Sequence, residues 1–61
     1  MYERYLKLLE KTGKTTAEVC RETGISPTTM SNWKARGGKL SVDNLKRLAD
    51  YFGVPMDYFL A

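Results

Sequence analysis

Hydrophobic side chains recur three and four positions apart along the first segment of the chain, which is the spacing of one helical face. They are Tyr2, Tyr5, Leu6 and Leu9. We therefore predict a helix over residues 2–12, with these side chains facing the core. Gly13 follows as a left-handed C-cap, because glycine adopts positive φ without steric cost.

A second helix is predicted from a capping signal rather than from a long apolar stripe. Thr15 and Glu18 have the spacing of a capping box, in which each side chain satisfies the free backbone N–H of the other. The helix is expected to run to about Glu22, with Val19 and Cys20 facing inward. At about two turns it is too short to be stable alone, so it needs its neighbours.

A third helix is predicted to begin at Ser26 and Pro27, since serine is a favoured N-cap and proline is favoured at the first helical position. It should continue to residue 35 or 36 and stop at the Gly37-Gly38 pair. The link of residues 23–26 is short and contains a glycine. Such a link between two helices is typical of a helix-turn-helix motif.

The fourth segment has the most regular apolar stripe of the chain. Ser41 is predicted as its N-cap and Gly53 as its C-cap. Beyond it, Pro55 starts a last short turn, in which Phe59 and Leu60 are expected to close the core. The stripe itself consists of Val42, Leu45, Leu48, Ala49 and Phe52.

The composition restricts both the fold and the chemistry. The 61 residues are expected to form one domain, 1–61, and no segment has the alternating pattern of a strand, so the predicted class is all-α. With no histidine and a single cysteine, the chain offers no zinc site and no nucleophile–base pair, so neither an enzyme nor a cofactor is expected. The lack of a disulfide, a signal peptide and an apolar run of membrane-spanning length predicts a cytoplasmic protein.

The charged residues are unevenly distributed. Ten lysines and arginines against seven acids give a net charge of +3. Between Thr23 and Val42 there is no acid, and the charged residues there are Lys34, Arg36 and Lys39. On charge alone, this window is either a solvated surface loop or a positive patch that faces a polyanion.

The third helix is predicted to expose a polar face of small residues. At 100° per residue, Met30 and Trp33 lie on its inner side. Short hydrogen-bonding side chains without acids favour close approach to the major groove of B-DNA, although a plain polar surface is the alternative. Asn32 suits an adenine edge, whereas Lys34 at the flank suits a phosphate. The exposed face consists of Thr28, Ser31, Asn32 and Ala35, flanked by Pro27 and Arg36.

These features together resemble a known family. The stretches GISPTTMSNWKARG and SVDNLKRLADYFGVPMDYFL are similar to the lambda-repressor-like helix-turn-helix family, the XRE or Cro-and-repressor type that includes small repressors of phages and Gram-positive bacteria. The resemblance implies a five-helix domain that binds a pseudo-palindromic operator as a homodimer and controls transcription. It rests on Thr15, Gly24, Ser26, Met30, Ser31, Trp33, Leu45, Leu48, Ala49, Gly53 and Phe59.

The resemblance further implies that the third helix is the recognition helix. Its base-facing residues would be Pro27, Thr28, Ser31 and Asn32. The family often has glutamine at the positions of Thr16 and Pro27. Because proline has no side-chain donor, Pro27 is expected to offer at most an apolar contact with a thymine methyl group.

Phosphate contacts are expected at two places. The resemblance puts the start of the second helix against a phosphate, where free backbone N–H groups also favour anions. The acid-free basic window is the other place. The predicted phosphate-contacting residues are Thr15, Thr16, Lys34, Arg36 and Lys39.

Three conspicuous residues have structural interpretations. Trp33 lies opposite the exposed face of the third helix, so we expect it in the core rather than as a stacking platform for single-stranded nucleic acid. Cys20 is expected to be a small buried hydrophobe rather than a redox sensor. For Tyr58, a core position and a contact with a dimer partner both stay open.

The sequence therefore predicts a sequence-specific duplex-DNA-binding regulator, a transcriptional repressor that acts as a homodimer. Neither a small-molecule ligand nor a membrane is expected as its partner. The alternative is a protein-interaction module with the same fold, such as an antirepressor or antitoxin subunit, in which Arg36 and Lys39 meet an acidic partner. Retention on heparin or random duplex DNA at low salt distinguishes the two classes.

Overall fold

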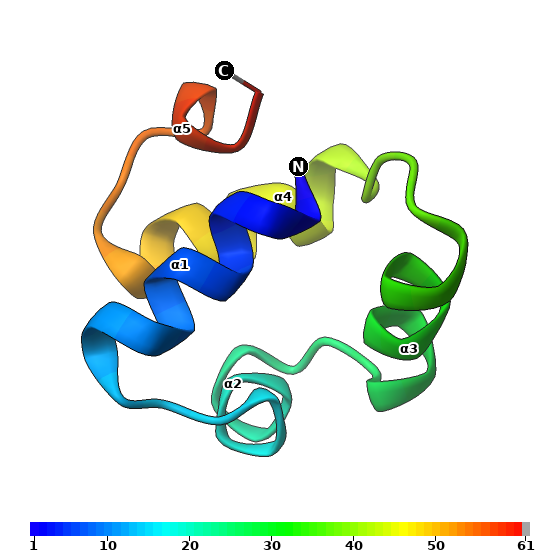
Figure 1. Ribbon diagram of the computed structural model, residues 1–61, viewed down its shortest axis with the longest axis horizontal. Coiled ribbons are helices and arrows are strands. Elements are labelled where there is room, and N and C mark those ends of the chain that lie inside the picture. The colour runs from blue at the N-terminus through cyan, green and yellow to red at the C-terminus, as the bar shows by residue number, and fades with distance from the viewer. Residues whose placement is uncertain (61) are drawn as a thin grey trace.

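The structure, a computed structural model, describes residues 1–60. Every element in this range is an α-helix, which confirms the predicted all-α class and its five helices (Figure 1). They are α1 (Tyr2–Thr12), α2 (Thr16–Thr23), α3 (Pro27–Arg36), α4 (Val42–Phe52) and α5 (Asp57–Leu60). None of these helices is long and apolar enough to cross a membrane.

Local capping bonds fix the starts of α2 and α3. Thr15 Oγ1 accepts a hydrogen bond from the Glu18 N–H at 3.2 Å, and the Thr15 N–H donates to Glu18 Oε1 at 3.4 Å. At α3, Ser26 Oγ accepts from the Thr28 N–H at 3.1 Å. These bonds satisfy N–H groups that have no partner inside the helix. The predicted capping box and both predicted helix starts are confirmed.

The inner face of α3 packs against α1 through a cluster of aromatic side chains. The Trp33 ring packs against Tyr2 and Tyr5 of α1, with centroids 4.8 Å and 5.5 Å away. Its indole N–H donates to the Gly38 carbonyl at 3.3 Å, which also fixes the chain after α3. The predicted core position of Trp33 is therefore confirmed. The full core comprises Tyr5, Leu8, Val19, Cys20, Ile25, Met30, Trp33, Leu45, Leu48, Ala49 and Phe59.

The prediction for the inner face of α1 is partly wrong. Leu6 was expected in the core but is 46% exposed, while Leu8 is buried in its place. The face of α1 is centred on the fully buried Tyr5. Since each residue turns the helix by about 100°, Leu6 points well away from that centre, whereas Leu8 lies on its other side.

Two further core predictions fail at element ends. Val42 is 71% exposed, because it is the first residue of α4 and the buried part of this helix begins one turn later, at Leu45. Leu60 is 55% exposed. Phe59, which is almost completely buried, is the residue of α5 that closes the core, and the half-buried Tyr58 packs beside it. The two misplaced residues are the first residue of α4 and the last residue of α5.

Tyr58 lies partly in the core and is partly exposed. It is half-buried, with its ring 5.5 Å from that of Phe59. The Arg4 guanidinium of α1 lies 5.2 Å from the centroid of the Tyr58 ring. The exposed part of the ring leaves a dimer contact at this residue as a prediction.

Candidate nucleic-acid interface

The turn between α2 and α3 is fixed by its own backbone and by α4. Gly24 has a left-handed φ of 81°, and its N–H donates to the Cys20 carbonyl at 3.0 Å. Ile25 follows and is buried in the core. From α4, Arg47 Nη1 donates to the Thr23 carbonyl at 3.1 Å. These contacts hold α2, the turn and α3 together as a helix-turn-helix pair.

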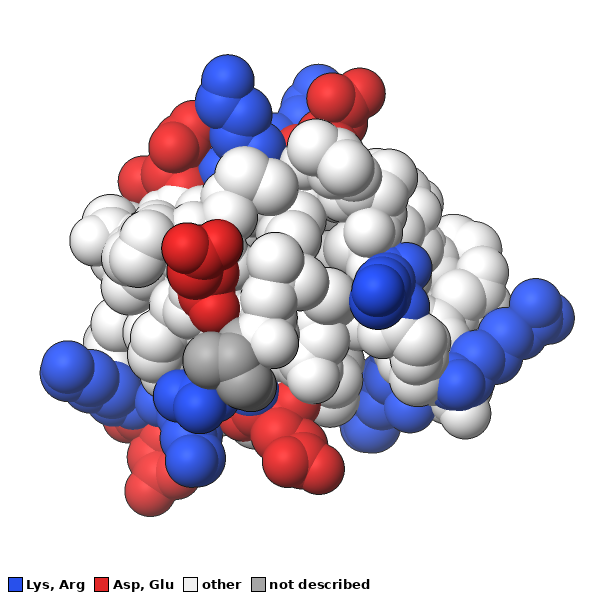
Figure 2. All heavy atoms as spheres, turned by 90° about the horizontal axis from the view of Figure 1, so that it is seen from above, with Lys and Arg blue, Asp and Glu red and all other residues white. Residues whose placement is uncertain are grey.

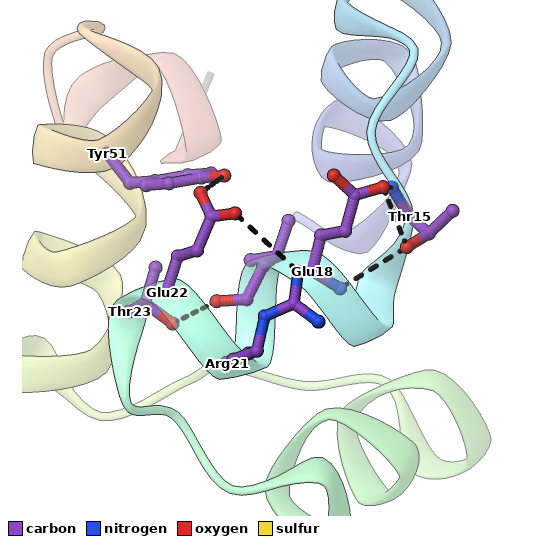
Figure 3. Close-up of polar contacts among 7 residues, drawn as sticks. Thr15, Glu18, Arg21, Glu22, Thr23 and Tyr51 are labelled. Carbon is purple, nitrogen blue, oxygen red and sulfur yellow. Dashed lines mark hydrogen bonds and ion pairs between the residues drawn. The ribbon is translucent and has the colours of Figure 1, made fainter.

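A polar cluster ties α2 to α4 and to the segment that precedes α2 (Figure 3). The Tyr51 hydroxyl of α4 donates a short hydrogen bond to Glu22 Oε1 of α2. Lys14 Nζ lies 5.3 Å from the centroid of the Tyr51 ring. The pKa of Lys14 is raised, first by its contact with Tyr51 and then by the negative charge of Glu22. This cluster adds side-chain contacts between α4 and α2, the helix that packs against α3.

The outward face of α3 is composed as predicted. Thr28, Ser31, Asn32 and Ala35 are all exposed, and so is Pro27 at the helix start. On the inner side, Met30 and Trp33 are buried. Within residues 1–60, no hydrogen bond to protein involves the side chains of Thr28, Ser31 or Asn32. Their donors and acceptors are therefore available to a ligand.

Basic side chains without acidic neighbours accompany this face. Lys34, Arg36 and Lys39 are exposed, and no acid occurs between Thr23 and Val42. At the end of the molecule where Figure 1 places α3, Figure 2 shows lysine and arginine but no aspartate or glutamate. Elsewhere in that view the two signs of charge are interspersed. The exposed side chains beside the α3 face thus carry positive charge without acids among them, which is the distribution that favours a polyanion.

Two grooves border the exposed face of α3. The groove between α2 and α3 has a volume of about 430 Å³, and Ala17, Cys20 and Pro27 form its apolar part. Thr16, Ser31 and Arg21 provide its polar rim. The other groove, of about 300 Å³, lies near the C-terminal end of α3 and includes Asn32, Arg36 and Lys39. Residues predicted to contact bases and residues predicted to contact phosphates therefore meet at each groove.

The two threonines at the start of α2 have different partners. The Thr15 hydroxyl accepts from the Glu18 N–H and lies 3.2 Å from Glu18 Oε1, to which it donates. Its hydrogen-bonding capacity is thus directed toward Glu18. Thr16 is half-buried, and its Oγ1 lies 2.8 Å from the hydroxyl of Tyr5. Of the two, Thr16 is the better placed to contact a ligand.

Sequence reasoning missed two residues of this surface, Ala17 and Arg21, and one buried residue below it, Tyr5. Tyr5 was interpreted only as an apolar core residue, although a buried tyrosine, unlike phenylalanine, needs a hydrogen-bond partner. Ala17 and Arg21 line the groove between α2 and α3. Arg21 is well exposed and lies 4.0 Å from Glu22. Because acids surround it in the sequence, the net-charge argument gave no reason to select it.

Cys20 at the edge of this groove is a buried thiol, as predicted. Burial raises its pKa, so the sulfur keeps its proton at neutral pH. Within residues 1–60 no group of three or more metal-ligating side chains gathers. The protonated sulfur contributes apolar surface to the groove.

Comparison with known proteins identifies a family to which this chain is similar. The model of a family described as Helix-turn-helix matches residues 6–59, a range that includes α2, the turn and α3. A curated protein of Rhizobium sp., the insertion element ISR1 uncharacterized 10 kDa protein A3, is 46% identical over 39 residues. The match covers 64% of this chain and 44% of the relative, so the chain spans less than half of that protein's length. No solved structure gives a significant match.

Proposed function

The chain belongs to the helix-turn-helix family, and from this premise we propose that it binds specific sites on duplex DNA and represses transcription there. The observation that carries the proposal is the outward face of α3. It is exposed, free of acids and made of short hydrogen-bonding side chains, with basic residues at its C-terminal end. A helix with this surface suits the major groove, where close approach and a positive flank are both needed.

Asn32 has the main role in reading bases under this proposal. Its amide offers one acceptor and a pair of N–H donors, which matches the N6 and N7 edge of adenine. Thr28 and Ser31 lie on the same exposed face and supply single hydrogen bonds. The methyl groups of Thr28 and Ala35 add apolar contacts with thymine.

Pro27 contributes shape rather than hydrogen bonds. It has no side-chain donor, and it lines the apolar part of the groove between α2 and α3 with Ala17 and Cys20. The 5-methyl group of a thymine is the part of a base edge that such a surface favours. We therefore assign Pro27 an apolar contact with a thymine at the N-terminal end of α3.

Phosphates hold the protein in register on the DNA. Lys34, Arg36 and Lys39 are exposed on the flank of α3 and make these contacts under the proposal. Thr16 adds a contact at the start of α2, where backbone N–H groups favour anions. Thr15 supports that site indirectly, because its hydroxyl is engaged with Glu18.

We further propose that two copies bind one pseudo-palindromic operator. Exposed Leu60 and the half-buried Tyr58 provide apolar surface at the C-terminal end of the described chain, which supports a contact between copies. A homodimer of this kind places its two recognition helices about 34 Å apart, one turn of B-DNA. The operator is then expected to contain two inverted half-sites with that spacing.

The proposal is tested by selecting bound sites from random duplexes and measuring the affinity for the selected site at several salt concentrations. We expect an enriched site with inverted halves, and affinity that falls steeply with salt because phosphate contacts release counterions. A protein that neither enriches a site nor binds random duplex or heparin at low salt contradicts the proposal. That result would favour the protein-interaction module instead.

A further inference from the structure

We propose that Tyr5, which is buried below the interface, orients the Thr16 hydroxyl so that Thr16 donates a hydrogen bond to a DNA phosphate. The inference rests on the proposed function and adds a positioning residue that has no surface of its own. Tyr5 has 0% of its surface exposed, whereas Thr16 is half-buried at the start of α2. Their oxygens lie 2.8 Å apart although the residues belong to different helices.

The direction of this hydrogen bond follows from which partners each hydroxyl has. Within residues 1–60, Thr16 Oγ1 is the one hydrogen-bond partner of the Tyr5 hydroxyl, and no buried side-chain polar atom lacks a partner. If Thr16 donated, the phenol proton of Tyr5 would have no acceptor inside the core, which carries a desolvation cost. The Tyr5 hydroxyl therefore donates and Thr16 Oγ1 accepts.

The accepted bond leaves the proton of Thr16 for an outside acceptor. A hydroxyl has one donor and two acceptor positions, so Thr16 can accept from Tyr5 and donate outward together. A hydroxyl that already accepts a bond is also polarised and becomes a better donor. Burial raises the pKa of Tyr5, so the phenol keeps the proton that this chain of bonds needs.

The surroundings of Thr16 fit a phosphate at that place. Thr16 lies on the rim of the groove between α2 and α3, together with Arg21 and the base-facing residues Pro27 and Ser31. It is the first residue of α2, where free N–H groups and the helix dipole favour an anion. Glu18 opposes this field, but its carboxylate is bonded back to Thr15.

The experiment combines protein variants with single-phosphate changes in the selected duplex. Tyr5→Phe removes the buried donor and is expected to weaken binding by about 3- to 10-fold, the size of one neutral hydrogen bond. Thr16→Val removes the proposed phosphate donor and is expected to weaken binding by about 10-fold or more. Thr16→Ser keeps the hydroxyl and should bind nearly as well as the wild type. Tyr2→Phe is the matched control, since it removes a tyrosine hydroxyl from the same helix.

Neutral methylphosphonate, placed at one phosphate at a time, separates positioning from simple structural support. When methylphosphonate replaces the phosphate that Thr16 contacts, Tyr5→Phe and Thr16→Val should bind this duplex as tightly as the wild type binds it. When methylphosphonate replaces any other phosphate, both variants should still bind more weakly than the wild type. The slope of affinity against salt should be unchanged in both variants, because a neutral hydroxyl releases no counterion.

Two results would overturn the inference while leaving the proposed function intact. One is wild-type affinity for Tyr5→Phe when the wild type binds its selected site. The other is a Tyr5→Phe deficit that is equal at every methylphosphonate position, as general destabilisation would produce. If Tyr5→Phe fails to fold in a thermal denaturation control, Thr16→Val decides by the same methylphosphonate comparison. Failure of the wild type to bind duplex DNA would instead reject the proposed function, and this inference with it.

Discussion

Gly24→Ala tests how the turn between α2 and α3 is held. Gly24 has a φ of +81°, a conformation that costs an L-residue about 1–2 kcal/mol. An added Cβ would lie 3.1 Å from Arg47 Nη1, so the guanidinium has to move. This shift weakens the hydrogen bond that Arg47 donates to the Thr23 carbonyl, and complete loss of that bond would add about 0.5–1.5 kcal/mol. We expect Gly24→Ala to lower the free energy of unfolding by more than the backbone cost alone, and by at most about 3.5 kcal/mol.

Gly13→Ala is the matched control for this prediction. Gly13 also ends a helix with positive φ, at +73°, but no atom of residues 1–60 lies within 4 Å of an added Cβ. It should therefore cost only the backbone part, about 1–2 kcal/mol. In an Arg47→Ala background, where the guanidinium is absent, the two glycine variants should cost the same.

Thermal and urea denaturation followed by circular dichroism measure these differences. In a domain of this size, 1 kcal/mol corresponds to about 4–8 °C in Tm, so the extra cost of Gly24→Ala is resolvable. Equal destabilisation by the two variants in the wild-type background would refute the argument. It would mean that the Arg47 guanidinium does not support the turn.

Other expectations concern the interface and the core. Lys34→Ala should weaken binding to selected and random duplexes alike and reduce the salt slope by about one unit, whereas Lys7→Ala on α1 should not; an unchanged slope for Lys34→Ala contradicts its phosphate contact. Replacing the contacted thymine by uracil removes one methyl group and should lower the binding free energy of the wild type by about 0.8 kcal/mol. The same replacement should lower the binding free energy of Pro27→Ala by less. Equal losses in the two proteins would argue against a contact between Pro27 and that methyl group. Burial raises the pKa of Cys20, so above the ordinary value of 9.0 the unfolded chain loses this proton before the folded one and stability falls as pH rises. Cys20→Ala should therefore lose less stability than the wild type as the pH rises. An identical pH dependence of the free energy of unfolding in the two proteins would contradict a raised pKa of Cys20.

The helix boundaries were predictable because local bonds determine them. The capping box of Thr15 and Glu18, and the N-cap at Ser26, involve residues within three positions of each other. Left-handed glycines likewise end α1 and α2 where the sequence placed them. Sequence spacing alone contains all the information that such features need.

Burial at the helix ends and contacts between helices were harder to predict from the sequence. Whether Val42 or Leu60 is covered depends on which other elements reach it, and local periodicity carries no such information. The hydrogen bond between Tyr5 and Thr16 joins two helices across 11 positions. Its sequence signal is a tyrosine at the centre of an otherwise apolar face, which indicates a partner without identifying it.

The candidate site likewise has one part that the sequence predicts and another part that depends on contacts between helices. The exposed face of α3 follows from its helical period and from the burial of Trp33, and the structure places those residues as expected. Arg21 and Ala17 join the site because α2 lies beside the start of α3. That arrangement is set by the turn at Gly24 and by Arg47, whose contact with Thr23 spans 24 positions.

Site selection carried out in parallel with the wild type and Asn32→Ala tests the central claim most directly. If the outward face of α3 reads the major groove, the wild type enriches a defined half-site. The variant should then lose its preference at one adenine position while the other positions are kept. The affinity of the variant for the wild-type site should fall by about 1–3 kcal/mol, with a much smaller change on random duplex. Equal losses on both duplexes, with the same selected site, would contradict the account.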